Sequence, residues 1–215
     1  MQNLKEGLLR LGAADTITRE FLLPYISAFR QSYPGIQLQV TNRTSLQLVQ
    51  SILQGTLDLA IVNLPIVDDR LCIQPILEIH DIFIAGHQFD FLHDHPLTPA
   101  ELAEYPLIML EQKSNSRCYV DRFFAQYQIV LSPKIELGSH DLLACFVDIG
   151  FGLACVVKEF CQKELDSKMV FPISLSPSIP SRHIGACWLK SLPLSVAAKE
   201  FLRLLSQEKS LEAPH

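Results

Sequence analysis

The feature that most constrains the fold is an alternation of two hydrophobic patterns that starts near the N-terminus. Residues 8–13 form a short apolar run typical of a buried strand, and residues 22–33 carry apolar side chains at helical spacing. We expect Thr16 or Thr18 to cap this helix. A Tyr-Pro-Gly sequence ends it, and residues 36–40 then alternate as a strand. Alternating strands and helices predict an α/β fold with mainly parallel sheets.

The next segment has the clearest local signals. Thr44 and Gln47 have the spacing of a capping box, in which each side chain satisfies an N–H group at the start of a helix. Gly55 stands where a glycine commonly ends a helix. Residues 57–62 follow as a buried strand, at the start of which Asp58 is interpreted as a structural hydrogen-bond acceptor. Residues 6–64 therefore predict a β-α-β-α-β run.

The rest of the chain continues the alternation. A long extended stretch at 73–86 predicts a crossover into a second lobe, and a second capping box with proline at the first helical position lies at 98–101. Further strands are predicted at 107–110, 135–137, 153–157 and 183–189, and further helices at 116–127, 142–149 and from 195 onward. Gly150 and Gly152 are interpreted as a helix stop and a site of close backbone packing. The polar tail at 208–215 is expected to fray.

Charge and hydropathy exclude several classes of function. The net charge is −5 and the lysines and arginines are dispersed, so we do not expect this chain to bind DNA by itself. Mean hydropathy is high at +0.21, but no apolar run approaches the length of a membrane helix. The first ten residues carry charge and do not resemble a signal peptide. We therefore expect a cytoplasmic protein with no membrane partner.

The cysteines and histidines do not indicate a metal or redox centre. None of the six cysteines forms a Cys-x-x-Cys pair, which argues against zinc-ribbon and thioredoxin-like sites. We expect free thiols buried as small apolar side chains, with a redox-active pair as the alternative. The His93-Asp94-His95 sequence could suggest a metal site, but exposed histidines in a proline-containing loop are usually solvated. No metal and no cofactor are expected.

Four segments in the right order resemble the effector-binding domain of LysR-type transcriptional regulators. They are LRLGAADTITREFLLPYISAFRQSYPGIQLQV, LVQSILQGTLDLAIV, HDHPLTPAELAEYPLIML and DLLACFVDIGFGLACVV. Each is weak alone, whereas four with matching gaps are specific and cover nearly the whole chain. The resemblance departs at the front, because such regulators carry a winged helix-turn-helix and a linker helix before the first strand. We expect that domain to be absent from this chain.

The resemblance implies both an architecture and a function. The fold would be a two-lobed α/β fold of the type 2 periplasmic-binding-protein kind, with residues 1–81 plus 183–215 as lobe I and 82–182 as lobe II. Two crossover strands near 80–85 and 183–188 would join the lobes. A small, anionic metabolite bound in the interlobe cleft would control DNA binding and transcription through the missing helix-turn-helix domain, which alone would contact DNA.

The chemistry of helix starts points to the same place. In open α/β sheets ligands bind beyond the carboxyl ends of the strands, where free N–H groups of helix N-termini favour anions. The ligand-binding residues predicted on this basis are Thr16, Thr18 and Thr44 in the first lobe and Lys113, Ser114, Asn115 and Ser139 in the second. The hydroxyl and amide side chains could instead serve only as helix caps, and Lys113 could be a charged clamp or a solvated lysine. Asp15 opposes an anion there, unless the ligand also carries an amine.

The predicted first helix also bears on assembly. Phe21, Tyr25, Phe29 and Tyr33 lie on more than one face of it, which is more than one core stripe needs. The family's sensor domains pair through such surfaces, so we expect a symmetric homodimer or a higher homo-oligomer. The alternative is a monomer whose aromatic side chains all point inward.

Two rival functions share this fold. A solute-binding protein of a transport system has the same ligand physics, but the start of the chain and its cysteine spacing argue against export. An enzyme would need a reactive constellation, and the only candidate is Cys145 with His140. These two lie five residues apart, on different faces of a helix, which is poor geometry for a thiolate–imidazole pair. We therefore do not expect catalysis.

Overall fold

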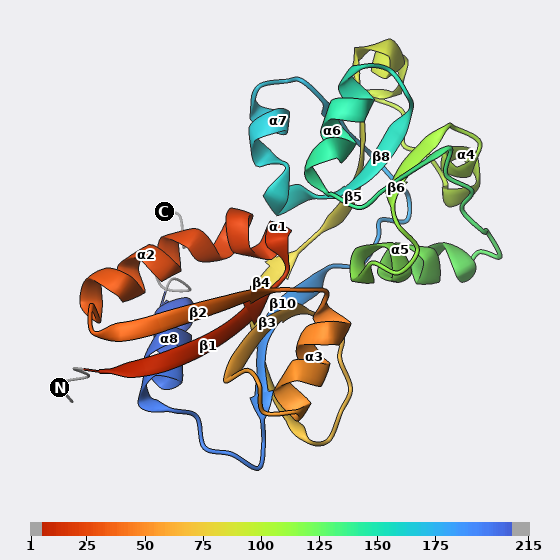
Figure 1. Cartoon of the computed structure of the whole chain (residues 1–215). Coiled ribbons are helices and arrows are strands. Elements are labelled where there is room, and N and C mark those ends of the chain that lie inside the picture. Colours follow the sequence, from red (N-terminus) through yellow and green to blue (C-terminus); the bar gives the residue numbers. More distant parts are fainter. Residues whose placement is uncertain (1–5, 208–215) are drawn as a thin grey trace. The chain divides into compact units, whose positions relative to one another are not determined.

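The computed structural model describes residues 6–207, which divide into two α/β units (Figure 1). Residues 6–78 together with 183–207 belong to the first unit, and Ile79–Arg182 form the second. We call them unit 1 and unit 2. The chain passes between them twice, after residue 78 and after residue 182. The predicted fraying of the tail at 208–215 lies outside the described residues.

Unit 1 is built on a five-stranded sheet in the order β2-β1-β3-β10-β4. Strand β1 pairs in parallel with β2 and β3, whereas β10 pairs antiparallel with β3. The sheet is therefore mixed rather than mainly parallel, because β10 returns from unit 2 and runs against the local strands. The strand bounds are β1 (Gly7–Ala13), β2 (Ile36–Asn42), β3 (Leu59–Asn63), β4 (Leu71–Ile79) and β10 (Arg182–Leu189).

The predicted first helix is three consecutive helical segments. They are α1 (Asp15–Ile17), a π-helical stretch η1 (Thr18–Leu22) and α2 (Leu23–Ser32). Pro24 explains the interruption, because proline has no N–H to donate to the carbonyl one turn earlier and its ring crowds that turn. The backbone widens by one residue there, and the Leu23 N–H bonds to the Thr18 carbonyl. The chain remains helical overall, but it is not one regular helix.

Helices cover both faces of the unit 1 sheet. Phe29 of α2 packs edge-on against Phe201 of α8 (Val196–Gln207), with 5.3 Å between ring centroids. On the other face α3 (Ser45–Leu53) packs Leu48 and Ile52 against Ala60 of β3. Each large apolar side chain buried in this way contributes about 1.5–3 kcal/mol of transfer free energy. The core of unit 1 is thus two apolar layers on either side of β1 and β3.

Unit 2 has its own five-stranded sheet in the order β7-β6-β8-β5-β9. Strand β6 pairs in parallel with β7 and β8, while β5 pairs antiparallel with β8 and β9. One face of the sheet carries an apolar cluster with α5 residues such as Phe124, and the other a cluster with α6 residues such as Leu143. The bounds are β5 (Asp81–Ala85), α4 (Pro99–Ala103), β6 (Leu107–Leu110), α5 (Asn115–Ala125), β7 (Ile135–Leu137), α6 (Asp141–Asp148), β8 (Leu153–Val157), α7 (Gln162–Asp166) and β9 (Phe171–Ile173).

Most of the strand and helix predictions are confirmed. Both capping boxes form, at Thr44 with Gln47 and at Thr98 with Glu101. Gly55 follows α3 with a φ of 71°. Asp58 is the predicted acceptor, because its carboxylate takes hydrogen bonds from the Arg10 backbone N–H at 2.7 Å and from its guanidinium Nη2 at 2.6 Å.

The two glycines after α6 also have the predicted roles. Gly150 has a φ of 94°, a left-handed conformation that ends α6 at little cost for glycine. A Cβ atom on Gly152 would clash with the Pro106 carbonyl oxygen, so the close approach of these two backbone segments requires glycine. Both interpretations from the sequence are confirmed.

Short elements between residues 86 and 173 were not predicted. The 3-10 segment η2 (His87–Leu92), the helix α7 and the strand β9 are too short to show a clear hydrophobic period. Strand β9 also contains Pro172, which argues against a strand in sequence. It forms at the end of the sheet next to β5, a position that tolerates a residue without an N–H group.

The six cysteines are free thiols, and their burial is uneven. Cys155, Cys161 and Cys187 are buried, and burial raises the pKa of Cys161 and of Cys187 to about 12. Cys118 and Cys145 are exposed, so the expectation that all six are buried is wrong. Both lie on helix surfaces, where a small apolar residue is tolerated singly. Within residues 6–207, no helix is both long enough and apolar enough to cross a membrane.

Candidate functional site

In each unit two helices begin at the same edge of the sheet. In unit 1, the last residues of β1 and β2 are in register, Ala13 opposite Asn42, and α1 and α3 start just beyond them. In unit 2, Leu110 at the end of β6 is in register with Leu137 at the end of β7, and α5 and α6 follow. We call these the carboxyl edges of units 1 and 2. Each presents the N–H groups of two helix N-termini.

Thr16 and Thr18 lie at the carboxyl edge of unit 1, but neither caps the helix. The N-cap residue is Ala14, and no side chain bonds to the first N–H groups of α1. The prediction of a threonine cap is therefore wrong, because the helix begins earlier, at Asp15. The Thr18 hydroxyl instead donates to the Ala14 carbonyl at 2.9 Å and accepts from Asn42 Nδ2 at 3.1 Å.

Thr44 caps α3 and is exposed at the same edge. Its Oγ1 accepts from the Gln47 N–H at 3.4 Å, and the Gln47 side chain accepts from the Thr44 N–H at 3.2 Å. The following residue, Ser45, is buried, and its hydroxyl accepts from the backbone N–H of Asn63 at 3.1 Å. The start of α3 is thereby fastened to the end of β3, so the two halves of this edge are held together.

At the carboxyl edge of unit 2, three predicted residues are consecutive. Ser114 is the N-cap of α5, and its Oγ accepts from the Arg117 N–H at 3.1 Å. Asn115 is the first residue of the helix and is half-buried, while Lys113 is exposed in the turn before it. The exposure of Lys113 is compatible with either of its two interpretations.

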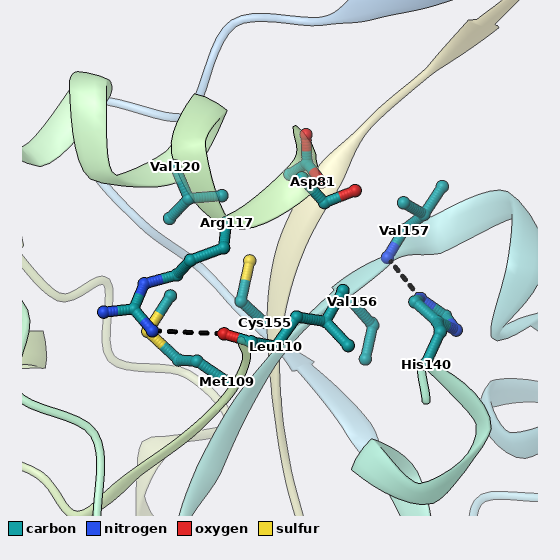
Figure 2. A pocket seen from close by; sticks show the side chains of 10 residues that line it. Asp81, Met109, Leu110, Arg117, Val120, His140, Cys155, Val156 and Val157 are labelled. Carbon is teal, nitrogen blue, oxygen red and sulfur yellow. Dashed lines mark hydrogen bonds between the residues drawn. The ribbon is translucent and has the colours of Figure 1, made fainter. Parts of the chain in front are cut away.

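Ser139 is half-buried before α6 and does not cap it. The N-cap residue is His140, which is buried, and its Nε2 accepts a hydrogen bond from the Val157 N–H at 2.9 Å. His140 Nε2 is therefore an acceptor, and the ring fastens the start of α6 to the end of β8 (Figure 2). Sequence reasoning considered His140 only as a partner for Cys145.

Two buried arginines support the carboxyl edge of unit 2. Arg117 donates to the Leu110 carbonyl at 3.1 Å and forms ion pairs with Asp121 at 2.8 Å and Glu136 at 2.9 Å. Burial lowers the pKa of Arg117, but the hydrogen bonds that its guanidinium donates to the two carboxylates outweigh burial, and the pKa is raised. Arg117 thus remains charged inside the protein and fixes the first turn of α5 on the end of β6.

The second arginine, Arg182, links three segments. Its guanidinium donates to both oxygens of Asp81, at 2.5 and 2.8 Å, and also to Ser116 Oγ at 2.8 Å. Asp81 and Arg182 are the first residues of β5 and β10, close to the two points where the chain passes between the units. The network therefore connects the first turn of α5 with both of these passages.

A small cavity lies among these groups (Figure 2). Arg117 and His140 stand on opposite sides of it, with the thiol of Cys155 between them. It has room for about one water molecule, which is far too little for a metabolite. Burial raises the pKa of Cys155 well above its usual value, so this thiol stays protonated. The cavity is part of the support beneath the carboxyl edge and not a ligand pocket.

Sequence reasoning missed the buried polar residues of both edges. They are Ser45, Asp81, Arg117, His140 and Arg182, together with the half-buried Ser116, which bonds to Arg182. A signal existed for Arg117, because it falls on the same helical stripe as Val120 and Phe124, and a charge on an apolar stripe needs partners. Asp81 and Arg182 lie 101 residues apart, and nothing local announces that they pair.

The histidines and cysteines considered for a metal site or a catalytic pair have structural contacts. Within residues 6–207, no group of three or more His, Cys, Asp or Glu side chains could hold a metal ion. His93 instead stacks on Phe171, with 4.8 Å between ring centroids. Cys145 Sγ contacts the Asp141 carbonyl at 3.6 Å, and His140 Nε2 is engaged with the Val157 N–H. These contacts are structural.

Comparison with known proteins gives the class of this chain. The model of the LysR substrate binding domain family matches residues 2–210, and the chain belongs to this family. It is 28% identical over 207 residues to the HTH-type transcriptional activator CmpR of Synechocystis, covering 95% of this chain and 67% of CmpR. The chain spans about two thirds or less of the length of the first curated relatives that it matches.

Solved structures confirm the fold. The regulatory domain of Synechocystis CcmR, solved in complex with 2-PG, superposes with a TM-score of 0.86 at 23% identity, covering 98% of this chain and all of that one. The effector-binding domain of QuiR, in complex with shikimate, superposes with a TM-score of 0.81 at 17% identity, covering 96% of this chain and 99% of that one. The predicted two-lobed α/β fold and the LysR-type effector-binding domain are thus confirmed, and transport is not favoured.

Proposed function

We propose that this chain senses a small anionic metabolite through its two carboxyl edges and transmits binding to a helix-turn-helix domain in the full-length regulator. One observation carries the proposal. In each sheet two neighbouring parallel strands end in register, and a helix begins just after each of them. Free N–H groups and the positive ends of helix dipoles favour carboxylates and phosphates. The ligands named for CcmR and QuiR, 2-PG and shikimate, support a small polar effector.

The residues proposed to contact the effector are those predicted from the sequence. Thr16 and Thr44 offer hydroxyls at the edge of unit 1. At the edge of unit 2, Lys113 offers an ammonium group, and Ser114, Asn115 and Ser139 offer polar groups. Thr18 is the weakest member, since its hydroxyl already has two partners. Ser116 is added, because its hydroxyl lies in the first turn of α5 and bonds to Arg182. A ligand that competes for Ser116 would disturb the link to both chain passages.

A matched pair of capping residues tests this assignment. Thr44→Ala removes a cap at a carboxyl edge, and Thr98→Ala removes an equivalent capping box from α4. Helix α4 comes after β5, which runs antiparallel to β8 and so leaves the sheet from its opposite edge. Each variant should lose about 1 kcal/mol of stability. Only Thr44→Ala, and likewise Ser114→Ala, should weaken effector binding, by about tenfold.

The experiment begins with a thermal-shift screen of small carboxylates and phosphates, because a ligand that binds only the native state raises the melting temperature. The effector found is then titrated into the three variants by calorimetry. Equal affinity for Thr44→Ala, Ser114→Ala and Thr98→Ala would show that the carboxyl-edge caps are structural only. No shift with any small anion would count against the proposed ligand class.

We also propose that the sensor domain pairs with a second copy, and that the full-length protein is a cytoplasmic, non-enzymatic regulator that binds DNA through its other domain. The aromatic argument for pairing is weaker than expected, since Phe29 is buried and the Tyr33 hydroxyl donates to Glu200 at 2.9 Å. Ile149 and Phe151 after α6 are better candidates, being 66% and 51% exposed. Ile149→Asp should shift sedimentation toward the monomer; a wild-type chain that stays monomeric at high concentration would contradict pairing.

A further inference from the structure

Unit 2 contains a second concave site, away from its carboxyl edge. It is a groove of about 710 Å³ between the 3-10 segment η2 and the helix α7. This volume lies within the usual range of small-molecule pockets. Its lining belongs entirely to unit 2 and shares no residue with the cavity beneath α5 and α6. Nothing in the proposed effector-sensing function uses it.

The floor of the groove is apolar and partly aromatic. Leu165, Val170 and Phe171 contribute apolar side chains, of which the last two are buried. The His93 ring stacks on the Phe171 ring at an interplanar angle of 24°. Two flat rings already lie nearly parallel there, so a third flat group can extend the stack.

The rim of the groove carries cations. Lys158 and Lys168 are both exposed and line it, and within residues 6–207 neither side chain has a hydrogen-bond or ion-pair partner. The one carboxylate in the lining, Asp90, is already approached by His87 Nδ1 at 3.3 Å. The groove therefore offers two uncommitted ammonium groups above an apolar floor.

Lys168 also has an unusual backbone conformation. Lys168 has a φ of 58°, a left-handed conformation at the end of α7 where glycine or asparagine is usually found. Its N–H closes the helix on the Leu165 carbonyl at 3.0 Å. A lysine gains no stability from this position over glycine, while its ammonium group gains a place on the rim of the groove. A cation therefore stands at a position where the backbone would favour glycine; Gln128 after α5 has a similar φ of 61°.

We propose that this groove binds a second small ligand, an organic anion with a flat apolar body such as an aryl phosphate or aryl carboxylate. The anionic group lies by Lys168 and Lys158, and the flat body lies over the His93–Phe171 stack. A ligand with only an anionic group would contact the lysines but not the apolar floor, and a ligand with only a ring would contact the floor but not the lysines. The groove therefore selects molecules that combine both, and it is separate from the effector residues of the carboxyl edge.

The probe is phenyl phosphate, titrated into the 215-residue chain while backbone amide shifts are recorded. Its dissociation constant is expected at about 1 mM or below, a reasonable value for so few atoms, with shifts centred on residues 158–171. Inorganic phosphate and phenol, the two halves of the probe, should each bind about tenfold more weakly or not at all. Equal binding by inorganic phosphate would mean an adventitious anion site and would overturn the proposal.

Lys168→Gly separates binding from stability. It removes the cation and also relieves the left-handed backbone, so the melting temperature should stay the same or rise while phenyl phosphate binds about fivefold more weakly. Lys158→Gln should weaken binding similarly. The matched control is Lys163→Gln, an exposed lysine of α7 outside the lining, which should leave binding unchanged. An equal loss in all three variants would show bulk charge attraction and contradict the site.

The same titration distinguishes a failure of the groove proposal from a failure of the proposed effector site. Ser114→Ala should leave phenyl phosphate binding at residues 158–171 intact. Shifts confined to residues 111–117 and 138–141 would mean that the probe occupies only the carboxyl edge, and the groove would be rejected while the effector proposal stood. No shift anywhere at saturating probe would reject the groove alone, since the effector need not resemble phenyl phosphate.

Discussion

Both units fasten the start of a helix to the end of a strand two positions away in the sheet, but they use different side chains to do so. Their sheets share the same order around a central strand, β2-β1-β3 in one and β7-β6-β8 in the other, and the helix after the outer strand is fastened to the far strand in both. In unit 1 the fastening is Ser45 Oγ on the Asn63 N–H. In unit 2 it is His140 Nε2 on the Val157 N–H.

The surroundings of these two fastenings differ more than the fastenings themselves. At the carboxyl edge of unit 1 the buried polar side chain is the neutral Ser45, whereas the charged Asp15 is exposed to water. The carboxyl edge of unit 2 rests on the buried charges of Arg117, Asp81 and Arg182. Side chains in water can reorient at little cost, whereas buried charges hold a single arrangement. We infer that unit 2 holds its carboxyl edge more rigidly than unit 1 holds its own.

The largest expected effect comes from the two arginine–aspartate pairs, one in each unit. The Arg182 guanidinium bonds to both oxygens of Asp81, whereas that of Arg10 bonds to Oδ1 of Asp58 alone. The side chains of Arg182 and Asp81 are 2% and 1% exposed, against 36% and 20% for Arg10 and Asp58. Arg182→Met strands a buried carboxylate, so the free energy of unfolding should fall by about 3–5 kcal/mol. Arg10→Met should lower it by only about 1 kcal/mol, because water can solvate Asp58. Urea unfolding of both variants measures the difference.

A double variant separates the pair from its burial. Asp81→Leu combined with Arg182→Met removes both charges, and much of the stability lost in Arg182→Met should return. Equal losses for Arg182→Met and Arg10→Met would contradict the inference that burial makes unit 2 more rigid.

The two fastening side chains should differ by less. His140→Ala leaves the Val157 N–H buried without its acceptor and removes a ring that contacts Phe160, so we expect a loss of about 2–3 kcal/mol. Ser45→Ala also removes an acceptor, but Asn63 is only half-buried and water can replace the hydroxyl, so the loss should be about 1 kcal/mol. Amide exchange of Val157 and Asn63 reports each bond directly. If Asn63 became the less protected of the two, the ranking of the edges would be reversed.

Local sequence signals predicted where the helices at the carboxyl edges begin, but not the buried side chains that fasten these helices to the sheets. The capping box at Thr44, the stop at Gly55 and the glycines after α6 depend on neighbouring residues, and all are confirmed. The regularity of the first helix was not predicted correctly, because Pro24 interrupts it with a π-helical stretch. Neighbouring residues therefore predict the start and end of a helix to within about one turn.

Long-range pairs were out of reach for a physical reason. The guanidinium of Arg182 meets Asp81 across 101 residues, and Ser45 meets Asn63 only because a helix and a strand pack in one register. Neither contact can be predicted from the neighbouring sequence, because no residue within a few positions indicates that these side chains need a partner. The predicted helix-start positions were therefore right about where the edges lie, whereas the buried network of unit 2 needed the fold.

The smallest expected effect distinguishes the two capping boxes by pH. The box on α3 closes with the amide of Gln47, and that on α4 closes with the carboxylate of Glu101. The backbone N–H of Thr98, and then its hydroxyl, hold the pKa of Glu101 below its usual value. A lowered pKa in the folded state means that the stabilisation is fully present above the unfolded pKa and is lost as pH falls through the folded pKa. Glu101→Gln should therefore be less stable than the wild type at neutral pH, with a difference that shrinks below about pH 4.

The reciprocal change tests the same cause in the other unit. Gln47→Glu gives the box of α3 a titrating carboxylate, which should stabilise the chain at neutral pH and lose that gain in acid, because a negative charge is favourable at a helix N-terminus only while it is ionised. Urea midpoints of the wild type and both variants across the acid range measure these differences, and both should be small because the two boxes are exposed. A pH-independent difference for Glu101→Gln, together with a pH-independent gain for Gln47→Glu, would show that the carboxylate acts by shape rather than by charge. The opposite slopes expected for the two variants are the sharper result. The net charge of the chain is −5, so general charge repulsion at neutral pH would stabilise Glu101→Gln and destabilise Gln47→Glu, which is the reverse of the effect expected from the capping boxes.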